Sequence, residues 1–123
     1  MTQEDKELLL KDLCARLPYS VKINENTQGD FTVIGLTTER VFTTCETEGC
    51  HNDFPIECVK PYLFPLSSMT EEQEKEYNDL NCYELGCFPH SEEALDYLTK
   101  NHFDYRYLIE KGLAIDATGL NIY

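Results

Sequence analysis

Two runs of β-branched and aromatic residues constrain the fold of this chain more than any other feature. FTVIGLT occupies residues 31–37 and VFTTC occupies residues 41–45, with polar, turn-forming residues on either side. Runs of this composition predict antiparallel strands joined by tight turns. A further strand is predicted over residues 54–59, and Pro55 places it at a sheet edge, because proline cannot donate a hydrogen bond to a neighbouring strand. We expect roughly three to five short strands in a small curled sheet or partial barrel.

The segment before these strands has the periodicity of a helix. Residues at the spacing of one helical face predict a helix over Gln3–Arg16. These residues are Leu10, Leu13, Cys14 and Leu17. Pro18 then ends the helix, since the residue before a proline avoids helical geometry.

Three helices are predicted in the second half of the chain, each preceded by a residue that can cap its N-terminus. Thr70 and Gln73 match the capping box, in which each side chain satisfies the other's free backbone amide. Ser91 and Asp104 are the other two caps, and Gly112 fits the left-handed position that follows a helix. The predicted helices cover residues 71–80, 92–100 and 105–111.

The order of these elements predicts the fold class. An N-terminal helix, then a small antiparallel sheet or partial barrel, then C-terminal helices make an α+β fold. With 123 residues and no internal repeat, the chain suits a single domain over residues 1–123. The apolar tail over residues 114–123 is expected to pack on the body of that domain.

A strong excess of negative charge limits the partners that the chain can bind. The net charge is −13, from 23 acidic and 10 basic side chains. Affinity for nucleic acids depends on Lys and Arg that displace counterions, so no direct nucleic acid binding is expected. Binding to an anionic membrane surface is disfavoured for the same reason. A basic protein partner is compatible with this charge.

The start of the chain indicates its cellular setting. MTQEDKELLLKDL lacks the basic start and the long apolar stretch of a secretory signal. No apolar run approaches the roughly 20 residues that a membrane-spanning helix needs. We therefore expect a cytoplasmic protein whose six cysteines are reduced thiols.

Two cysteine segments raise the sharpest chemical question. CETEGCH over residues 45–51 and CYELGCFPH over residues 82–90 each hold two cysteines, a glycine and a histidine. Two such pairs could supply the four ligands of a zinc site, although their spacing is wider than the usual one. Disulfide pairing, and thiols that are buried or idle, are the alternatives. The cysteines are Cys45, Cys50, Cys82 and Cys87, with His51 or His90 as substitutes.

Motifs of known enzyme classes are missing from the sequence. There is no nucleophile elbow, no phosphate-binding glycine loop and no paired-histidine metalloprotease motif. Cys50 and His51 are adjacent, but adjacency in sequence does not bring two side chains together for catalysis. The sequence therefore predicts neither an enzyme nor a cofactor-binding protein.

One aromatic segment is a candidate partner-binding site. FDYRYLI over residues 103–109 places Tyr105, Arg106 and Tyr107 together, and Tyr and Arg are favoured at binding hot spots. In the alternative interpretation, Tyr105 or Tyr107 packs on the core while Arg106 pairs with a nearby carboxylate.

Three long sequence segments resemble those of a known family. They are KELLLKDLCARLPYSVK, VKPYLFPLSSMTEEQEKEY and HFDYRYLIEKGLAIDATGLNIY. Together they resemble a family of small uncharacterised proteins from gut Bacteroides-type bacteria and their phages or mobile elements. Members of that family often have Asp-Tyr-Arg-Gly where this chain has Asp104–Tyr107. The resemblance implies an intracellular bacterial or phage setting and a single domain, and it carries over no catalytic residue.

These observations leave two function classes, with an enzyme of unrecognised type trailing as a third. The favoured one is a small acidic intracellular protein-binding or adaptor protein, encoded by a phage or mobile element and acting on a basic host partner. The alternative is a zinc-stabilised structural module that uses the Cys45/Cys50 and Cys82/Cys87 pairs.

Overall fold

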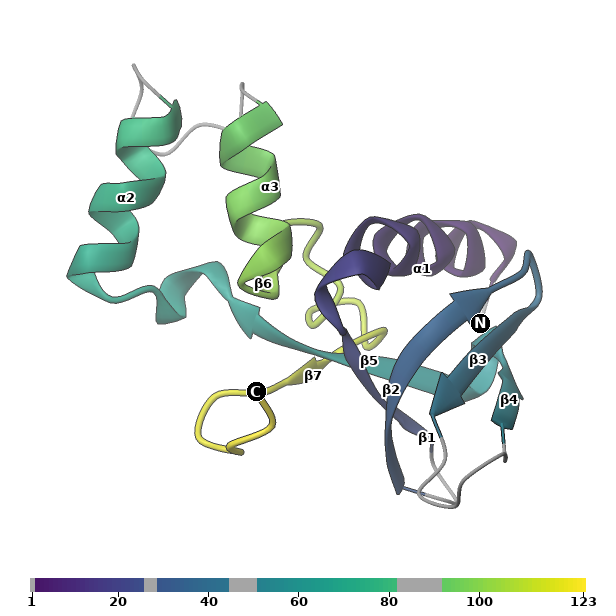
Figure 1. The fold of residues 1–123 in the computed structure, drawn as a ribbon. Helices are drawn as coiled ribbons and strands as arrows, with labels where there is room; N and C mark the ends of the chain where they lie inside the picture. The colour runs from purple at the N-terminus through teal and green to yellow at the C-terminus, as the bar shows by residue number, and fades with distance from the viewer. Residues whose placement is uncertain (1, 26–28, 45–50, 82–91) are drawn as a thin grey trace.

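The computed structural model describes residues 2–25, 29–44, 51–81 and 92–123 (Figure 1). Its helices and strands follow the predicted order of a helix, a sheet and further helices, so the α+β fold is confirmed. In chain order they are α1 (Gln3–Arg16), β1 (Lys22–Glu25), β2 (Gly29–Leu36), β3 (Arg40–Thr44), β4 (His51–Pro55), β5 (Val59–Pro65), α2 (Glu71–Asn81), α3 (Glu92–Lys100), β6 (Phe103–Asp104) and β7 (Ile115–Asp116).

The strands form one open sheet in the order β4-β3-β2-β1-β5-β6, with β7 also paired to β5. The first five strands pair antiparallel, whereas β6 and β7 run parallel to β5. The register of β2 against β3 shifts between Val33 and Gly35, and such an irregularity increases the local twist. Pro55 lies in β4 at the sheet edge, as predicted.

The single strand predicted over residues 54–59 is wrong. β4 ends at Pro55, a 3₁₀ turn follows over Ile56–Cys58, and β5 begins at Val59. The turn brings the fully buried Ile56 into the core, and the Ile56 amide donates to the Glu39 carbonyl oxygen at 3.0 Å. Tertiary packing of one side chain thus divides a run that has the local composition of a strand.

Helix α1 has the predicted bounds, and its inner face includes most of the predicted one. Thr2 caps it, because its hydroxyl oxygen accepts from the Asp5 amide at 3.1 Å. The residues fully buried on its inner face are Leu9, Asp12, Leu13 and Arg16. Of the predicted face, Leu13 is fully buried, Leu10 and Leu17 pack partly buried against the core, and Cys14 is exposed. The buried face is shifted because Asp12 and Arg16 neutralise each other and can enter the interior together.

Two hydrophobic clusters make up the interior. The larger one lies between α1 and the sheet and contains Leu9, Leu13, Val21, Ile23, Val33, Val41, Phe54, Ile56, Val59, Leu63, Leu108, Leu113 and Ala114. The smaller one lies between α2, α3 and the end of β5, around Leu98, Phe103 and Tyr105. Figure 1 shows α2 and α3 as a pair of helices set away from α1 and β1–β4, with β5 leading from the sheet towards α2.

The predicted caps of α2 and α3 have different outcomes. The capping box of α2 is confirmed: the Thr70 amide donates to Gln73 Oε1 at 3.0 Å, and the Gln73 amide donates to Thr70 Oγ1 at 3.2 Å. Ala94 and Leu98 are buried on one face of α3, as its periodicity predicts. Ser91, the predicted cap of α3, lies outside the described residues.

The helix predicted over residues 105–111 is wrong, although its predicted ends have a structural role. The Asp104 carboxylate accepts from the amides of Leu108 and Ile109 at 2.9 and 3.0 Å, and Gly112 has the left-handed φ of 74°. Between them, Tyr107 adopts a φ of 58°, a left-handed conformation that a regular helix excludes. The segment is therefore a series of turns that folds back on the Asp104 carboxylate.

The C-terminal tail packs on the body, as expected. β7 pairs with β5, and the Tyr123 hydroxyl lies 2.9 Å from the Lys22 amide and 2.7 Å from the Tyr62 carbonyl oxygen. Leu120 and Tyr123 are still exposed, at 50% and 42% of their surface. None of the helices in the described ranges combines the length and the apolar character that crossing a bilayer requires.

Candidate functional site

The three residues predicted to bind a partner have different environments. Tyr105 is only 8% exposed, and Arg106 Nη1 lies 2.9 Å from Asp12 Oδ1. These two residues follow the alternative interpretation, in which a tyrosine packs on the core and Arg106 pairs with a carboxylate. Tyr107 is 47% exposed, so of the three it offers the most surface to a partner. A partner-binding role for the segment stays a prediction.

A buried ionic cluster fixes this segment to α1. Asp12 and Arg16 have no exposed side-chain surface, and Arg16 Nε lies 2.8 Å from Asp12 Oδ2. Arg16 Nη2 also donates to the Phe103 carbonyl oxygen at 2.6 Å. Both guanidinium groups face the Tyr105 ring, with the Arg16 carbon 5.4 Å and the Arg106 carbon 4.6 Å from its centre. Asp12 therefore pairs with two arginines, one from α1 and one from this segment.

Three buried polar atoms near this cluster lack a hydrogen-bond partner among the described residues. They are Arg16 Nη1, His102 Nδ1 and Tyr105 Oη. Most buried polar groups in folded proteins are paired, so such atoms are expected at sites where something else binds. His102 links the cluster to the surface, since it also lines a pocket.

His102 is held as a neutral ring at pH 7. Its imidazole stacks on the Tyr123 ring at 3.7 Å between centres, with 12° between the planes. Burial, assisted by the positive charge of Arg16, lowers the pKa of His102 to about 4. Burial likewise raises the pKa of Tyr123 to about 12, so its phenol stays protonated. The stacked pair is therefore uncharged under ordinary conditions.

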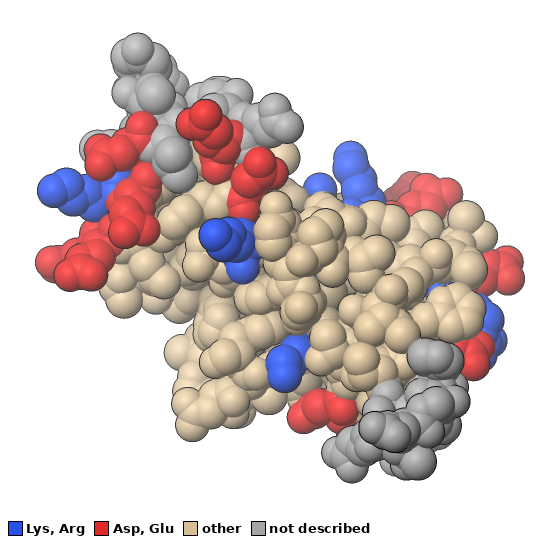
Figure 2. Space-filling model, in the orientation of Figure 1, with Lys and Arg blue, Asp and Glu red and all other residues tan. Residues whose placement is uncertain are grey.

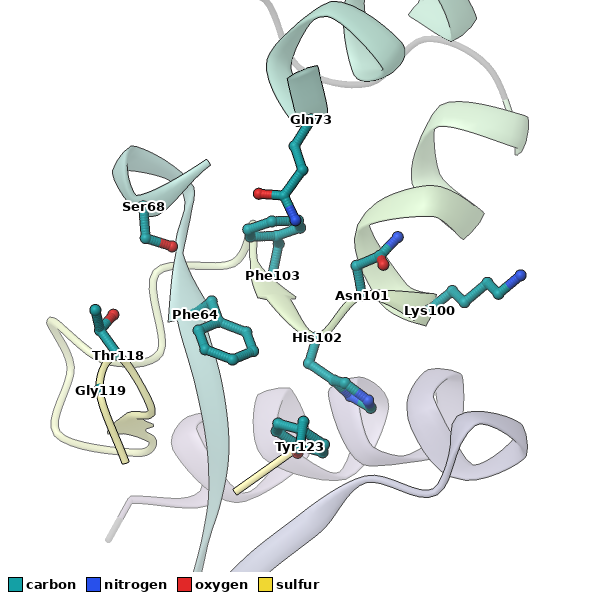
Figure 3. Close-up of a pocket in the computed structure, with 10 residues that line it drawn as sticks. All are labelled: Phe64, Ser68, Gln73, Lys100, Asn101, His102, Phe103, Thr118, Gly119 and Tyr123. Atoms are coloured by element: carbon teal, nitrogen blue, oxygen red, sulfur yellow. The ribbon is translucent and has the colours of Figure 1, made fainter. Parts of the chain in front are cut away.

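The pocket is an open cavity of about 390 Å³ between the α2–α3 pair and the C-terminal tail (Figure 3). Its walls come from the end of β5, the start of α2, the end of α3, β6 and the tail. They comprise Phe64, Ser68, Gln73, Lys100, Asn101, His102, Phe103, Thr118, Gly119 and Tyr123. Although the chain has 23 acidic residues, none of the described residues that line the pocket is Asp or Glu.

Sequence reasoning missed both the cluster and the pocket. The cluster had one detectable signal, an Asp-x-x-x-Arg pair at the i, i+4 spacing on the face that carries Leu9 and Leu13. The pocket had none, because its lining comes from segments as far apart as Phe64 and Tyr123. Such a site becomes visible only once the chain is folded.

The cysteine segments fall outside the part of the chain that the structure describes. Cys45, Cys50, Cys82 and Cys87 all lie in undescribed stretches, so the zinc-site prediction remains a prediction. Within the described ranges, no group of three or more His, Cys, Asp or Glu side chains is placed to hold a metal ion. Elemental analysis of protein purified without added metal tests the prediction: about one zinc per chain would support it, and none would contradict it.

Acidic side chains gather over α2 and α3. Figure 2 shows this concentration at the upper left of the molecule. The exposed acidic residues of the two helices are Glu71, Glu72, Glu74, Glu76, Asp79, Glu93 and Asp96. The exposed basic residues of the same helices are Lys75 and Lys100. This acidic face, defined by those seven carboxylate residues, is the clearest charge feature in the view.

Comparison with protein-family models, with curated proteins and with solved structures gives no match to this chain.

Proposed function

We propose that the protein is a small protein-binding or adaptor protein that docks a basic partner on the acidic face of α2 and α3. The observation that carries the proposal is the composition of that face, with seven exposed carboxylate residues against two lysines. The remaining charge of the chain has the same sign, since its net charge is −13. A concentrated field of one sign steers an oppositely charged partner and raises its association rate.

The acidic face lies on a supported scaffold. The capping box fixes the start of α2, and the Tyr97 hydroxyl donates to Glu76 Oε2 at 3.1 Å, which joins α3 to α2. Leu98 anchors α3 in the smaller hydrophobic cluster. Carboxylates held on preordered helices lose less conformational freedom on binding than those on a loose tail. This support favours a docking surface over a purely solubilising one.

The proposed setting is the cytoplasm of a bacterium, with a phage or mobile-element origin and a host protein as the partner. The sequence resemblance supports that setting. Tyr107 is the proposed apolar contact beside the charged one, because it is an exposed aromatic ring of the kind that is enriched at interfaces.

Affinity capture from a bacterial lysate tests the proposal. The immobilised protein is expected to retain basic proteins at about 0.1 M salt and to release them at about 1 M, because the Debye length falls from about 10 Å to about 3 Å. A bead loaded with an unrelated protein of similar net charge removes proteins that bind any acidic surface. Capture of no basic protein, or capture that is insensitive to salt, would contradict the proposal.

A further inference from the structure

The pocket beside His102 has the size of a small-molecule site. Its volume of about 390 Å³ lies in the range of ordinary ligand cavities, which begins at roughly 300 Å³. Its walls belong to secondary structure or to the anchored tail, so the described part of the chain shapes it. The pocket is separate from the exposed carboxylates of the acidic face, because none of them contributes to its lining.

Aromatic rings form the apolar part of the pocket. The Phe64 ring lies 6.3 Å from the Phe103 ring and 5.9 Å from the Tyr123 ring, both at tilted angles. Figure 3 shows Phe64 and Phe103 opposite the end of Gln73, with His102 and Tyr123 below them. Rings at these separations prefer a further ring that packs against a face or an edge. The ligand that fits this wall is planar.

One polar side chain of the lining can donate a hydrogen bond to an acceptor on a ligand. Several are already bonded: Ser68 donates to the Pro65 carbonyl oxygen at 2.6 Å, and Asn101 Nδ2 donates to the Tyr97 carbonyl oxygen at 2.8 Å. Gln73 Oε1 accepts from the Thr70 amide, which leaves the Gln73 Nε2 donors without a partner in the described ranges. A carbonyl oxygen on the ligand would pair with Gln73 Nε2.

The charges around the pocket disfavour an anion and give a cation no ion pair. A cation would find no carboxylate among the described residues of the lining. An anion would meet the field of a chain with a net charge of −13, and the one lysine, Lys100, extends away from the other labelled side chains in Figure 3. His102 adds no charge at neutral pH, as described above. The pocket is therefore best matched by a neutral molecule.

From these three properties we propose that the pocket binds an uncharged, planar ring that bears a carbonyl acceptor, such as an aromatic amide. The ring lies against Phe64, and the carbonyl oxygen accepts from Gln73 Nε2. This activity is independent of partner docking on the acidic face, so either can fail without the other.

Titration with four ring compounds of similar size tests the proposed class. Benzamide is neutral and planar, benzoate is an anionic analogue, benzylamine is a cationic analogue at pH 7 without a carbonyl, and cyclohexanecarboxamide is neutral but its ring is not planar. Backbone amide shifts of Asn101, His102 and Gly119, followed by NMR, are expected to give benzamide a Kd of about 1–10 mM, which is ordinary for a ligand of this size. The other three are expected to bind at least about 3-fold more weakly, because each lacks at least one required property.

Two outcomes of that titration would overturn the proposal. One is the absence of shifts at these amides with benzamide up to about 20 mM, well beyond the expected Kd. The other is binding of benzoate, benzylamine or cyclohexanecarboxamide that is as tight as that of benzamide.

A Gln73→Glu variant tests the assigned donor without removing the helix cap. Glutamate keeps the oxygen that accepts from the Thr70 amide, and it is itself a capping-box residue. The variant is expected to weaken benzamide binding about 3- to 10-fold, because the donor is lost, and to make benzylamine binding tighter, because a carboxylate now faces the pocket.

Gln3→Glu is the matched control, since it changes the same residue type in the first turn of α1. It is expected to leave all four affinities unchanged. Equal benzamide affinity in the Gln73→Glu variant and the unmodified protein would overturn the assigned contact and the ligand class that follows from it.

Discussion

Replacing Asp12 by asparagine removes the only charge that the structure places within ion-pair distance of Arg16 in the described part of the chain. Arg16 has no exposed side-chain surface, so its guanidinium cannot regain water when the carboxylate disappears. Arg106 is 17% exposed and can move into solvent. Breaking a buried ion pair from one side typically costs about 3–5 kcal/mol, and the partial rehydration of Arg106 favours the lower half of that range.

Urea unfolding followed by circular dichroism measures this loss. A chain of this size has a free energy of unfolding of about 6–18 kcal/mol, so the Asp12→Asn variant is expected to fold and to unfold at a lower urea concentration. With a slope of about 1–3 kcal/mol per molar urea, a loss of about 3 kcal/mol lowers the midpoint by about 1–3 M. Reducing conditions keep the cysteines from forming disulfides during the measurement.

The exposed pair of Arg40 and Asp53 provides the matched control. Both side chains are more than 40% exposed, so Asp53→Asn is expected to cost about 0.2–1 kcal/mol. A second test replaces both fully buried partners, Asp12→Leu with Arg16→Met, which leaves only the partly exposed Arg106 unpaired and is expected to recover part of the loss. A loss in Asp12→Asn that is no larger than that of Asp53→Asn would refute the argument that burial gives Asp12 its importance.

Three further changes have predicted effects on the free energy of unfolding, each measured in the same urea assay. Tyr107→Gly is expected to stabilise the protein by about 0.5–1 kcal/mol, because glycine adopts the φ of 58° without strain, whereas Tyr107→Ala brings no such gain. Thr70→Ala is expected to cost about 1 kcal/mol through loss of the capping box, and Thr70→Ser to cost little. The low pKa of His102, about 4 against 6.5 when unfolded, means that the unfolded state binds more protons between these values. The free energy of unfolding therefore falls as pH drops from 6.5 to 4. The His102→Asn variant is expected to reduce that fall, and asparagine tolerates the left-handed φ of 62° at this position. An unchanged pH profile in this variant would contradict the assignment of the fall to His102.

Local signals in the sequence predicted the parts of the fold that depend on neighbouring residues. The bounds of α1 follow from Pro18 and the spacing of its leucines, and the start of α2 follows from the Thr70–Gln73 capping box. The edge position of Pro55 follows from its missing N–H group. In each case the physical cause acts within a few residues, so the sequence contains it.

The parts that could not be predicted depend on residues far apart in the chain. Arg16 enters the interior because Asp12 neutralises it and because the Phe103 carbonyl, 87 positions away, accepts from it. The prediction of a helix over residues 105–111 failed because the Asp104 carboxylate caps turns around a left-handed Tyr107. Helical propensity gives no warning of such a conformation.

The candidate site also combines features that local sequence predicts with features that depend on distant residues. The sequence singled out the Tyr105–Arg106–Tyr107 segment from its composition, and the structure shows that Tyr105 and Arg106 belong to an internal ionic cluster. The net charge was the only sequence signal for the acidic face. The sequence could not locate that face, because the position of its carboxylates depends on how α2 and α3 pack.

Partner capture by two charge-matched variants tests the proposed function most directly. One variant replaces four glutamates of the acidic face by glutamine, at Glu72, Glu74, Glu76 and Glu93. The other replaces four exposed glutamates elsewhere, at Glu4, Glu39, Glu57 and Glu110. Both have the same net charge, so any difference between them reflects position. We predict that the first variant loses most of the salt-sensitive basic proteins at about 0.1 M salt while the second retains them; equal retention by the two would contradict docking on α2 and α3.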